Sequence, residues 1–401
     1  MTSFALAWRT AQRYRARTLL AVAGVAVIGA LLFDMLLLSR GLLLSFADLL
    51  DSSGFDIRVV SSEGLSARMP ISGSARLAGD LRRSAGVQHV LMIRIESATA
   101  RAAGVPPRAV SLVGSTGGDE GVWRVLQGAK LDSTAASAER CPLLITRPLA
   151  SSFGLTPGAS LTINVRPSGV TSVLPPVACR VVGVAEFAFA PTDDLTAVTT
   201  MEAFRDAMGG GGPADADLIL VSSRPDAAPG SVLRAIAQLR PDLRAYSNEE
   251  VVAQFNRNGF AYFRQISIVL SSLTMVFAFL LVATLLTVSI NQRLGEIAAL
   301  RALGIGRTRI ASMLLWESAL LVGAGGLLAL PLGEALALVL DRILRQMPGI
   351  PERMHFFVFQ PRALAIHLTL LAVTAVAAAA YPVWLTARLP IAETLRREVL
   401  G

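Results

Sequence analysis

Lysine and histidine are scarce in this sequence, and their scarcity excludes several kinds of catalytic site. Lys130 is the only lysine, and because it does not lie in a G-x-x-x-x-G-K-[ST] motif, the chain has no P-loop with which to bind ATP. The histidines are isolated, and neither H-E-x-x-H nor a Cys/His metal spacing occurs. No G-x-S-x-G nucleophile elbow occurs either. We therefore expect no catalytic residues, no metal site and no cofactor in this chain, which is not expected to be an enzyme.

Cysteine is almost as rare, with Cys141 and Cys179 the only two in the chain. Each begins an apolar run, CPLLI and CRVVGV respectively. In an oxidising compartment such a pair can form a disulfide, whereas the same runs also suit two free thiols buried in strands. Both possibilities stay open at this point.

Charge is low and unevenly placed. Charged residues make up 16% of the chain and hydrophobic residues 53%, with a mean hydropathy of +0.56. Soluble domains rarely combine these values, whereas a membrane protein with one sizeable soluble part does. The net charge of +8 lies beside the ends of apolar runs, which marks those ends as cytoplasmic and argues against nucleic-acid binding. The arginines concerned are Arg9, Arg13, Arg15, Arg17, Arg293, Arg301, Arg307, Arg309, Arg388, Arg396 and Arg397.

Apolar runs long enough to cross a bilayer occur four times. The first begins at Thr18 and exceeds the roughly 7–15 apolar residues of a signal peptide, so we expect an uncleaved span. Asp34 interrupts this run near its outer end, where we expect a carboxylate that is solvated or paired with a neighbouring helix. In the third run Gly323, Gly325 and Gly326 are expected to permit close helix packing.

The middle of the chain changes character, with Pro, Gly and Ser between short runs of period two. Ile57 and Val59 alternate with polar residues, as expected for a half-buried strand, and helical patches lie between such runs. Ser247 and Glu250 form an S-x-x-E capping box that predicts the start of a helix.

The predicted fold is four transmembrane α-helices with an α+β extracytoplasmic domain inserted between helices 1 and 2. Both termini are then cytoplasmic. The expected segments are an amphipathic cytoplasmic helix (1–17), a first span (18–44, extending as a stalk to 50), the extracytoplasmic domain (51–246), a stalk helix (247–265), a second span (266–290), a cytoplasmic helix and loop (291–309), a third span (310–340), an outer loop (341–362), a fourth span (363–387) and a cytoplasmic tail (388–401).

The organising feature is the stretch from Asn291 to Glu317, NQRLGEIAALRALGIGRTRIASMLLWE, between the second and third spans. Leu294, Ile297 and Ala298 recur at helical spacing and form an apolar stripe. We expect a short helix on the cytoplasmic face, followed by a turn at the glycines and then the next span.

Several motifs of this chain resemble one family. The segments RLGEIAALRALGIGRTRI (293–310), WESALLVGAGG (316–326) and YPVWLTARLPIAETLR (381–396) resemble the C-terminal permease segment of the MacB/FtsX/LolCE superfamily of type VII ABC transporters. In the middle domain LQG (126–128), LLITRPLASSFGLTPGASL (143–161) and VVGV (181–184) resemble the periplasmic core domain of MacB-like proteins.

The resemblance implies a stand-alone permease like LolC or LolE, since the ATPase domain fused at the N-terminus of MacB is not found in these residues. It further implies a dimer with an identical or related second permease in the bacterial inner membrane, above a pair of ABC ATPases that bind ATP and Mg²⁺. A periplasmic or lipoprotein partner is also expected. ATP-driven closure of the ATPases is expected to move the outer domains by mechanotransmission. The residues that the resemblance assigns to the ATPase-coupling helix are Arg293, Leu294, Glu296, Ile297, Arg301 and Gly304.

Three functions compete at this stage. The first is a permease that drives export, or extraction from the membrane, of a lipid-linked, hydrophobic or peptide substrate. The second is an FtsX-like signalling protein whose outer domain regulates a cell-envelope enzyme. The third is a membrane-anchored scaffold that works with no ATPase. The full-length core domain favours the first, because the outer domains of FtsX are smaller.

Overall fold

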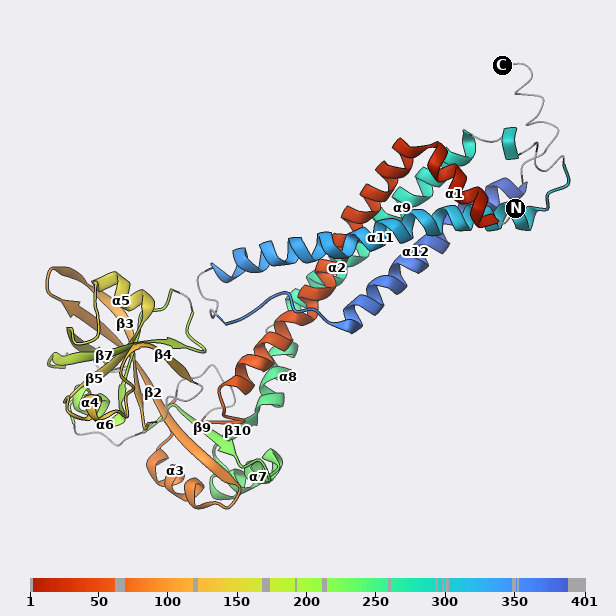
Figure 1. Ribbon diagram of the computed structural model, residues 1–401. Coiled ribbons are helices and arrows are strands. Elements are labelled where there is room, and N and C mark those ends of the chain that lie inside the picture. Colours follow the sequence, from red (N-terminus) through yellow and green to blue (C-terminus); the bar gives the residue numbers. More distant parts are fainter. Residues whose placement is uncertain are drawn as a thin grey trace. The chain divides into compact units, whose positions relative to one another are not determined.

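A computed structural model describes residues 3–61, 69–117, 122–167, 174–191, 193–210, 215–258, 261–292, 295–297, 299, 303–347, 351 and 353–388 (Figure 1). The chain divides into two compact units. The helical unit comprises Met1–Leu42, Phe260–Ile343 and His355–Gly401, and the β-rich unit comprises Leu43–Gly259 and Leu344–Met354.

The helical unit is built from long apolar helices. Four segments of its helices are long and apolar enough to cross a membrane, namely Arg15–Ser52, Arg264–Asn291, Thr308–Arg345 and Pro361–Ala380. The third of these helices runs past residue 340 to Arg345. Near this end Asp341 is buried, and its Oδ1 accepts a hydrogen bond of 2.7 Å from the Phe356 backbone N–H. The helices are α1 (Ser3–Arg13), α2 (Arg15–Ser52), α9 (Ala261–Asn291), α11 (Arg307–Arg345) and α12 (Pro361–Arg388).

Small and branched apolar side chains hold these helices together. Val25 of α2, Leu286 of α9, Val322 of α11 and Ala378 of α12 belong to one buried cluster. Asp34 of α2 is fully buried, and neither of its carboxylate oxygens has a hydrogen-bond partner within the described residues. The expectation of a solvated or paired carboxylate was therefore wrong, because neighbouring helices cover this position while providing no polar partner.

The β-rich unit contains a 10-stranded mixed sheet, in the order β10-β1-β9-β2-β3-β8-β5-β7-β4, with β6 paired to β2 and β7. Short helices lie between groups of one to three strands along the chain, and the unit thus combines helices with a mixed sheet, as predicted for an α+β domain. The elements are β1 (Ile57–Val60), α3 (Ser74–Arg83), β2 (Val87–Ala102), β3 (Val105–Ser115), β4 (Trp123–Gly128), α4 (Thr134–Ser137), β5 (Pro142–Thr146), α5 (Arg147–Phe153), β6 (Ser160–Arg166), β7 (Val177–Phe187), β8 (Thr196–Thr200), α6 (Met201–Ala207), β9 (Leu218–Ser223), α7 (Pro229–Leu239), β10 (Arg244–Ser247) and α8 (Asn248–Asn258).

Period-two patterning sorts the strand side chains onto two faces of the sheet. Ile57 and Ile219 pack with Leu81 of α3 and Ile236 of α7 on one face. On the same face, side chains of β5 and β6 pack against α5 and α6. The other face carries a separate apolar cluster that includes Ile93, Leu144, Val198 and Leu220. Most strands of the sheet are therefore apolar on both faces.

Two local sequence patterns, strand alternation and a helix capping box, have the structure expected of them. Strand β6 alternates buried and more exposed residues, with Leu161, Ile163 and Val165 buried between polar residues. The capping box is also confirmed, with the Ser247 N–H donating to Glu250 Oε2 at 3.1 Å and the Glu250 N–H donating to Ser247 Oγ at 3.2 Å. Strand β1 differs from the prediction of a half-buried strand, because all its residues are buried, Arg58 included.

Candidate functional site

The candidate site lies where α1, α2, α9 and α11 meet in the helical unit. Helix α1 ends at Arg13 and α2 begins at Arg15. Across this joint, the hydroxyl of Thr18 donates to the Ala11 carbonyl at 3.1 Å. Phe4 of α1 meets Trp316 of α11 edge to face, with ring centroids 5.3 Å apart. The predicted amphipathic helix is thus fastened to the other helices at both of its ends.

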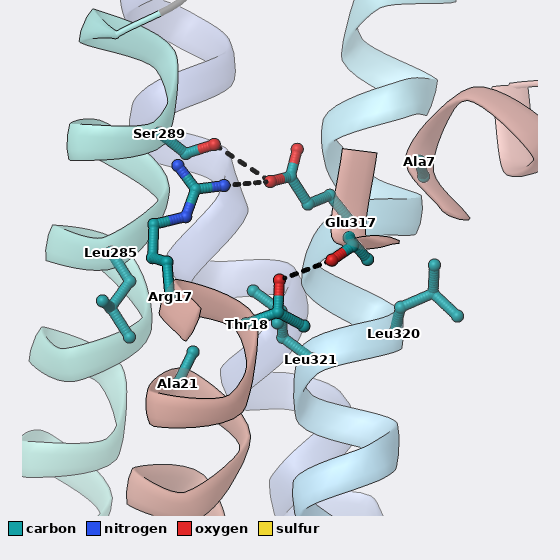
Figure 2. Close-up of a pocket in the computed structure, with 10 residues that line it drawn as sticks. Ala7, Arg17, Thr18, Ala21, Leu285, Ser289, Glu317, Leu320 and Leu321 are labelled. Atoms are coloured by element: carbon teal, nitrogen blue, oxygen red, sulfur yellow. Dashed lines mark hydrogen bonds and ion pairs between the residues drawn. The ribbon is translucent and has the colours of Figure 1, made fainter. Parts of the chain in front are cut away.

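A buried ion pair joins three of these helices (Figure 2). Arg17 Nη2 of α2 lies 3.2 Å from Glu317 Oε1 of α11, and the same oxygen accepts a hydrogen bond of 2.9 Å from Ser289 Oγ of α9. Arg17 Nη1 also donates to Gln292 Oε1 at 3.3 Å. Because Glu317 is only 3% exposed, its charge depends on these partners for stabilisation.

Figure 2 shows the side chains of Arg17, Ser289 and Glu317 converging from three helices, with Leu285, Leu320 and Leu321 around them. The space left between them is only about 10 Å³, close to the room that one water molecule needs. This cluster is therefore a packed joint between helices and leaves no room for a substrate. We call Arg17, Ser289 and Glu317 the joint cluster.

The predicted coupling segment begins directly after α9. Arg293, Leu294 and Arg301 lie outside the described residues, whereas Glu296, Ile297 and Gly304 are described. Ile297 is buried against Ile290 of α9 and against Ile310 and Leu314 of α11. Its side chain therefore anchors the segment to its own helices.

Two other positions of this segment are accessible. Glu296 is exposed, and its Oε1 lies 3.7 Å from Arg13 Nη1, a surface pair worth about 0–1 kcal/mol. Leu303 is 81% exposed, which is unusual for a large apolar side chain. Gly304 has a φ of +86°, and this left-handed conformation at the end of a helical turn favours glycine. The turn thus presents Leu303 at the surface.

The glycines predicted for helix packing divide into two groups. A Cβ at Gly325 would lie 2.6 Å from Val25 of α2, and one at Gly326 would lie 2.6 Å from Leu371 of α12. Gly323 faces open space, with nothing within 4 Å of such a Cβ. Two of the three glycines therefore lie at close helix contacts within this chain.

Cys141 and Cys179 are joined by a disulfide in the β-rich unit. The sheet brings them together because β5 and β7 are parallel neighbours that pair Pro142 with Arg180. Within the part of the chain that the structure describes, no group of three or more His, Cys, Asp or Glu residues could hold a metal ion.

Sequence reasoning missed the joint cluster. Glu317 was noticeable as an acid inside an apolar run, and such a residue implies a buried partner. Arg17, at the cytoplasmic end of the first span, was the cation most suited to that role. The pairing itself spans 300 residues of sequence, and no local pattern predicts it.

Comparison with known proteins gives two family matches. Residues 268–391 match the family model of the FtsX-like permease C-terminal domain, and residues 18–239 match that of the MacB-like periplasmic core domain. Together these matches include α9, α11 and α12 as well as most of the β-rich unit.

One curated relative is an uncharacterized ABC transporter permease protein of Mycobacterium tuberculosis, which is 32% identical over 134 residues. That alignment covers 33% of this chain and only 15% of the relative.

Solved structures are similar at lower identity. The periplasmic region of MacB from Actinobacillus actinomycetemcomitans is 15% identical, with 51% of this chain and 95% of that one covered and a TM-score of 0.41. The extracellular domain of the noncanonic ABC-type transporter YknZ from Gram-positive bacteria is 16% identical, with 48% and 99% covered and a TM-score of 0.35.

The assignment rests on the family matches, one of which spans more than half of the chain. They agree with the four apolar helices and with the β-rich unit that follows the first of them in the chain. This chain belongs to the MacB/FtsX family of ABC transporter permeases.

Proposed function

We propose that this permease passes the work of ATP hydrolysis to its β-rich unit and thereby exports, or extracts from the membrane, a lipid-linked, hydrophobic or peptide substrate. ATP and Mg²⁺ are bound by an ABC ATPase pair outside these 401 residues, because this sequence has no P-loop. The proposal rests on the joint cluster, which connects α2, α9 and α11. The coupling segment between α9 and α11 has exposed residues such as Glu296 and Leu303.

The coupling segment receives the motion. Glu296 and Leu303 are two of the exposed residues in the described part of this segment, one charged and one apolar, and a groove in the ATPase can hold both. Ile297 keeps the segment attached to α9 and α11. A displacement of the segment by the ATPase would therefore move both α9 and α11.

The joint cluster carries the motion onward. Glu317 of α11 holds Arg17 of α2 and Ser289 of α9 through one carboxylate oxygen, so α2 has to follow when α9 and α11 move. Helix α2 continues without a break to Ser52, within the β-rich unit. Rigid helices with specific contacts are the kind of element that transmits coupling over distance.

The proposed setting is the bacterial inner membrane. The four apolar helices cross it, with the β-rich unit outside the cytoplasm, inserted between the first two spans, and both termini inside. The arginines beside the span ends support this orientation. A second permease subunit, identical or related, completes the assembly, and a periplasmic or lipoprotein partner receives or delivers the substrate.

Charge reversal at Glu296 tests the proposal. The complex is isolated through a tag on the full chain in native membranes, and bound ATPase and ATP hydrolysis are both measured. We expect Glu296→Arg to lower the ATPase bound or its rate of hydrolysis. The matched control Glu202→Arg, at an exposed position of α6, should change neither.

A charge swap separates the two roles that Glu296 can have. If Glu296 serves only to pair with Arg13, then Arg13→Glu combined with Glu296→Arg restores the wild-type values. If Glu296 contacts the ATPase, the swap does not restore them, and this is the result we expect. Full activity in Glu296→Arg alone would contradict the assignment of the coupling segment.

A further inference from the structure

The β-rich unit contains a large cavity over the face of its sheet that lies opposite α3 and α7. Its volume of about 770 Å³ falls within the roughly 300–1,000 Å³ typical of small-molecule sites. Neighbouring strands each contribute apolar side chains to its floor, because they present alternate residues to this face. These floor residues include Val60, Ile93, Val113, Phe187, Val198 and Leu220.

Two helices of the same unit line the cavity from another side. Phe46 and Leu50 come from the last turns of α2, and Val251 and Phe255 come from α8. The rings of Phe46 and Phe255 lie 4.4 Å apart, so the two helices are in direct contact there. The cavity is therefore bounded by apolar side chains from both the sheet and the helices.

Two side chains that line the cavity each carry a buried donor atom without an acceptor. Arg58 is 6% exposed, and although its Nη1 donates to Asn248 Oδ1, its Nη2 has no hydrogen-bond partner within the described residues. Trp123 is 5% exposed, and its Nε1 likewise has none there. Unpaired buried donors are costly and uncommon in native proteins, so each calls for an acceptor.

The carboxylates that line the cavity are already engaged. Asp217 accepts a hydrogen bond of 2.8 Å from the Ile95 N–H and pairs with Arg94, while Asp194 accepts one of 2.8 Å from the Thr196 hydroxyl. Ser111 and Gln254 also line the cavity and can both donate and accept, so Arg58 is the lining residue that favours an anionic group on a ligand.

Arg58 keeps its positive charge despite its burial. Burial lowers its pKa to about 10, while the nearby Asp51 and Asp56 act to raise it. The guanidinium is therefore protonated at neutral pH. Its carbon also lies 5.6 Å from the centroid of the Phe189 ring, which helps to hold the group at the cavity wall.

We propose that this cavity binds an amphipathic carboxylate, with an apolar chain along the sheet and the carboxylate next to the positively charged side chain of Arg58, which lines the cavity. The apolar floor and helices exclude a strongly polar ligand, and the buried cation favours an anion over a neutral head group. The site belongs to the β-rich unit and does not rest on the coupling mechanism proposed above.

Photo-crosslinking tests the site in the full chain. The protein is placed in phosphatidylcholine nanodiscs with a diazirine analogue of palmitic acid, illuminated, and digested for peptide mapping by mass spectrometry. We expect labelled peptides that contain floor residues such as Val113. Labelling of the apolar helices by probe dissolved in the bilayer gives an internal reference.

Arg58→Met should lower the cavity labelling about tenfold or more, since the cation that attracts the carboxylate is lost. Arg124→Met, at a side chain 65% exposed in the same sheet, is the matched control and should leave labelling unchanged. Val113→Trp, which fills the cavity while keeping Arg58, should also abolish it. Maleimide-resistant cysteines in each variant show that the disulfide-bearing unit has folded.

Competition identifies the ligand class. Unlabelled palmitic acid should displace the probe from the cavity, whereas hexadecanol, with the same chain and no charge, should displace it at least about tenfold less well. A diazirine phosphatidylcholine should not label the floor peptides. The proposal is overturned if labelling is confined to the apolar helices, if Arg58→Met and Arg124→Met behave alike, or if the alcohol or the phospholipid binds as well as the acid.

Discussion

Replacement of Glu317 by glutamine removes one charge from the joint cluster and keeps its shape. In the wild type, one carboxylate oxygen of Glu317 receives both Arg17 and Ser289. Glutamine at this position can still accept those hydrogen bonds through its amide oxygen. The substitution therefore isolates the contribution of the charge.

The magnitude follows from the burial of the two partners. Breaking a fully buried ion pair costs about 3–5 kcal/mol, because the remaining charge is left uncompensated. The Arg17 side chain is 20% exposed and keeps Gln292 as a neighbour at 3.3 Å, so part of its charge is still solvated or bonded. We therefore expect Glu317→Gln to lower the free energy of unfolding by about 1–3 kcal/mol.

The assay is equilibrium unfolding of the full chain in mixed micelles. Glu334→Gln, at an exposed position of the same helix, is the matched control and should lie within about 0.5 kcal/mol of wild type. A double-mutant cycle with Arg17→Met should yield a coupling free energy above about 1 kcal/mol. If Glu317→Gln is no more destabilising than Glu334→Gln, or if the coupling is zero, the joint cluster does not hold the helices together.

Three further predictions concern packing, the disulfide and the helix cap. Gly325→Val should destabilise the helical unit by about 1–3 kcal/mol, because its Cβ would overlap a neighbouring helix. Gly323→Ala should be neutral or slightly stabilising in the same unfolding assay, and equal effects of the two variants would contradict the packing. Unreduced protein should show no maleimide-reactive thiol, and two free thiols in oxidised protein would disprove the disulfide. The variant in which serine replaces both Cys141 and Cys179 should have a free energy of unfolding lower by about 2–4 kcal/mol. Ser247→Ala should cost about 0.5–2 kcal/mol by removing one arm of the capping box, and an unchanged midpoint would show that the cap contributes nothing.

Local features were predictable because neighbouring residues determine them. The capping box of Ser247 and Glu250 needs only the helix start and the right residue three positions later. The apolar helices follow from composition alone, since a run without charge can be buried in lipid. The alternation of apolar and polar residues in β6 also predicts which of its side chains are buried, because that strand has one covered face and one accessible face.

Non-local features were not predictable from one sequence. Arg58 follows the alternation expected of an outward-facing residue, yet it is buried because α2 and α8 cover the second face of the sheet. The spacing of Ile297 predicts an apolar stripe on a short helix, but spacing alone does not tell that this side chain packs against α9 and α11. The disulfide stayed open for the same reason, since only strand pairing brings Cys141 to Cys179.

Cross-linking from Leu303 tests the central claim most directly, because this side chain is exposed at the end of the coupling segment. Leu303→Cys in native membranes is treated with a short bifunctional maleimide, and the products are probed for an ATP-binding subunit. Leu239→Cys, at an exposed apolar position of α7, is the control. The account predicts a product that joins Leu303→Cys to an ABC ATPase and no such product from the control. The absence of ATPase from the Leu303→Cys products, or its equal presence in both, would contradict it.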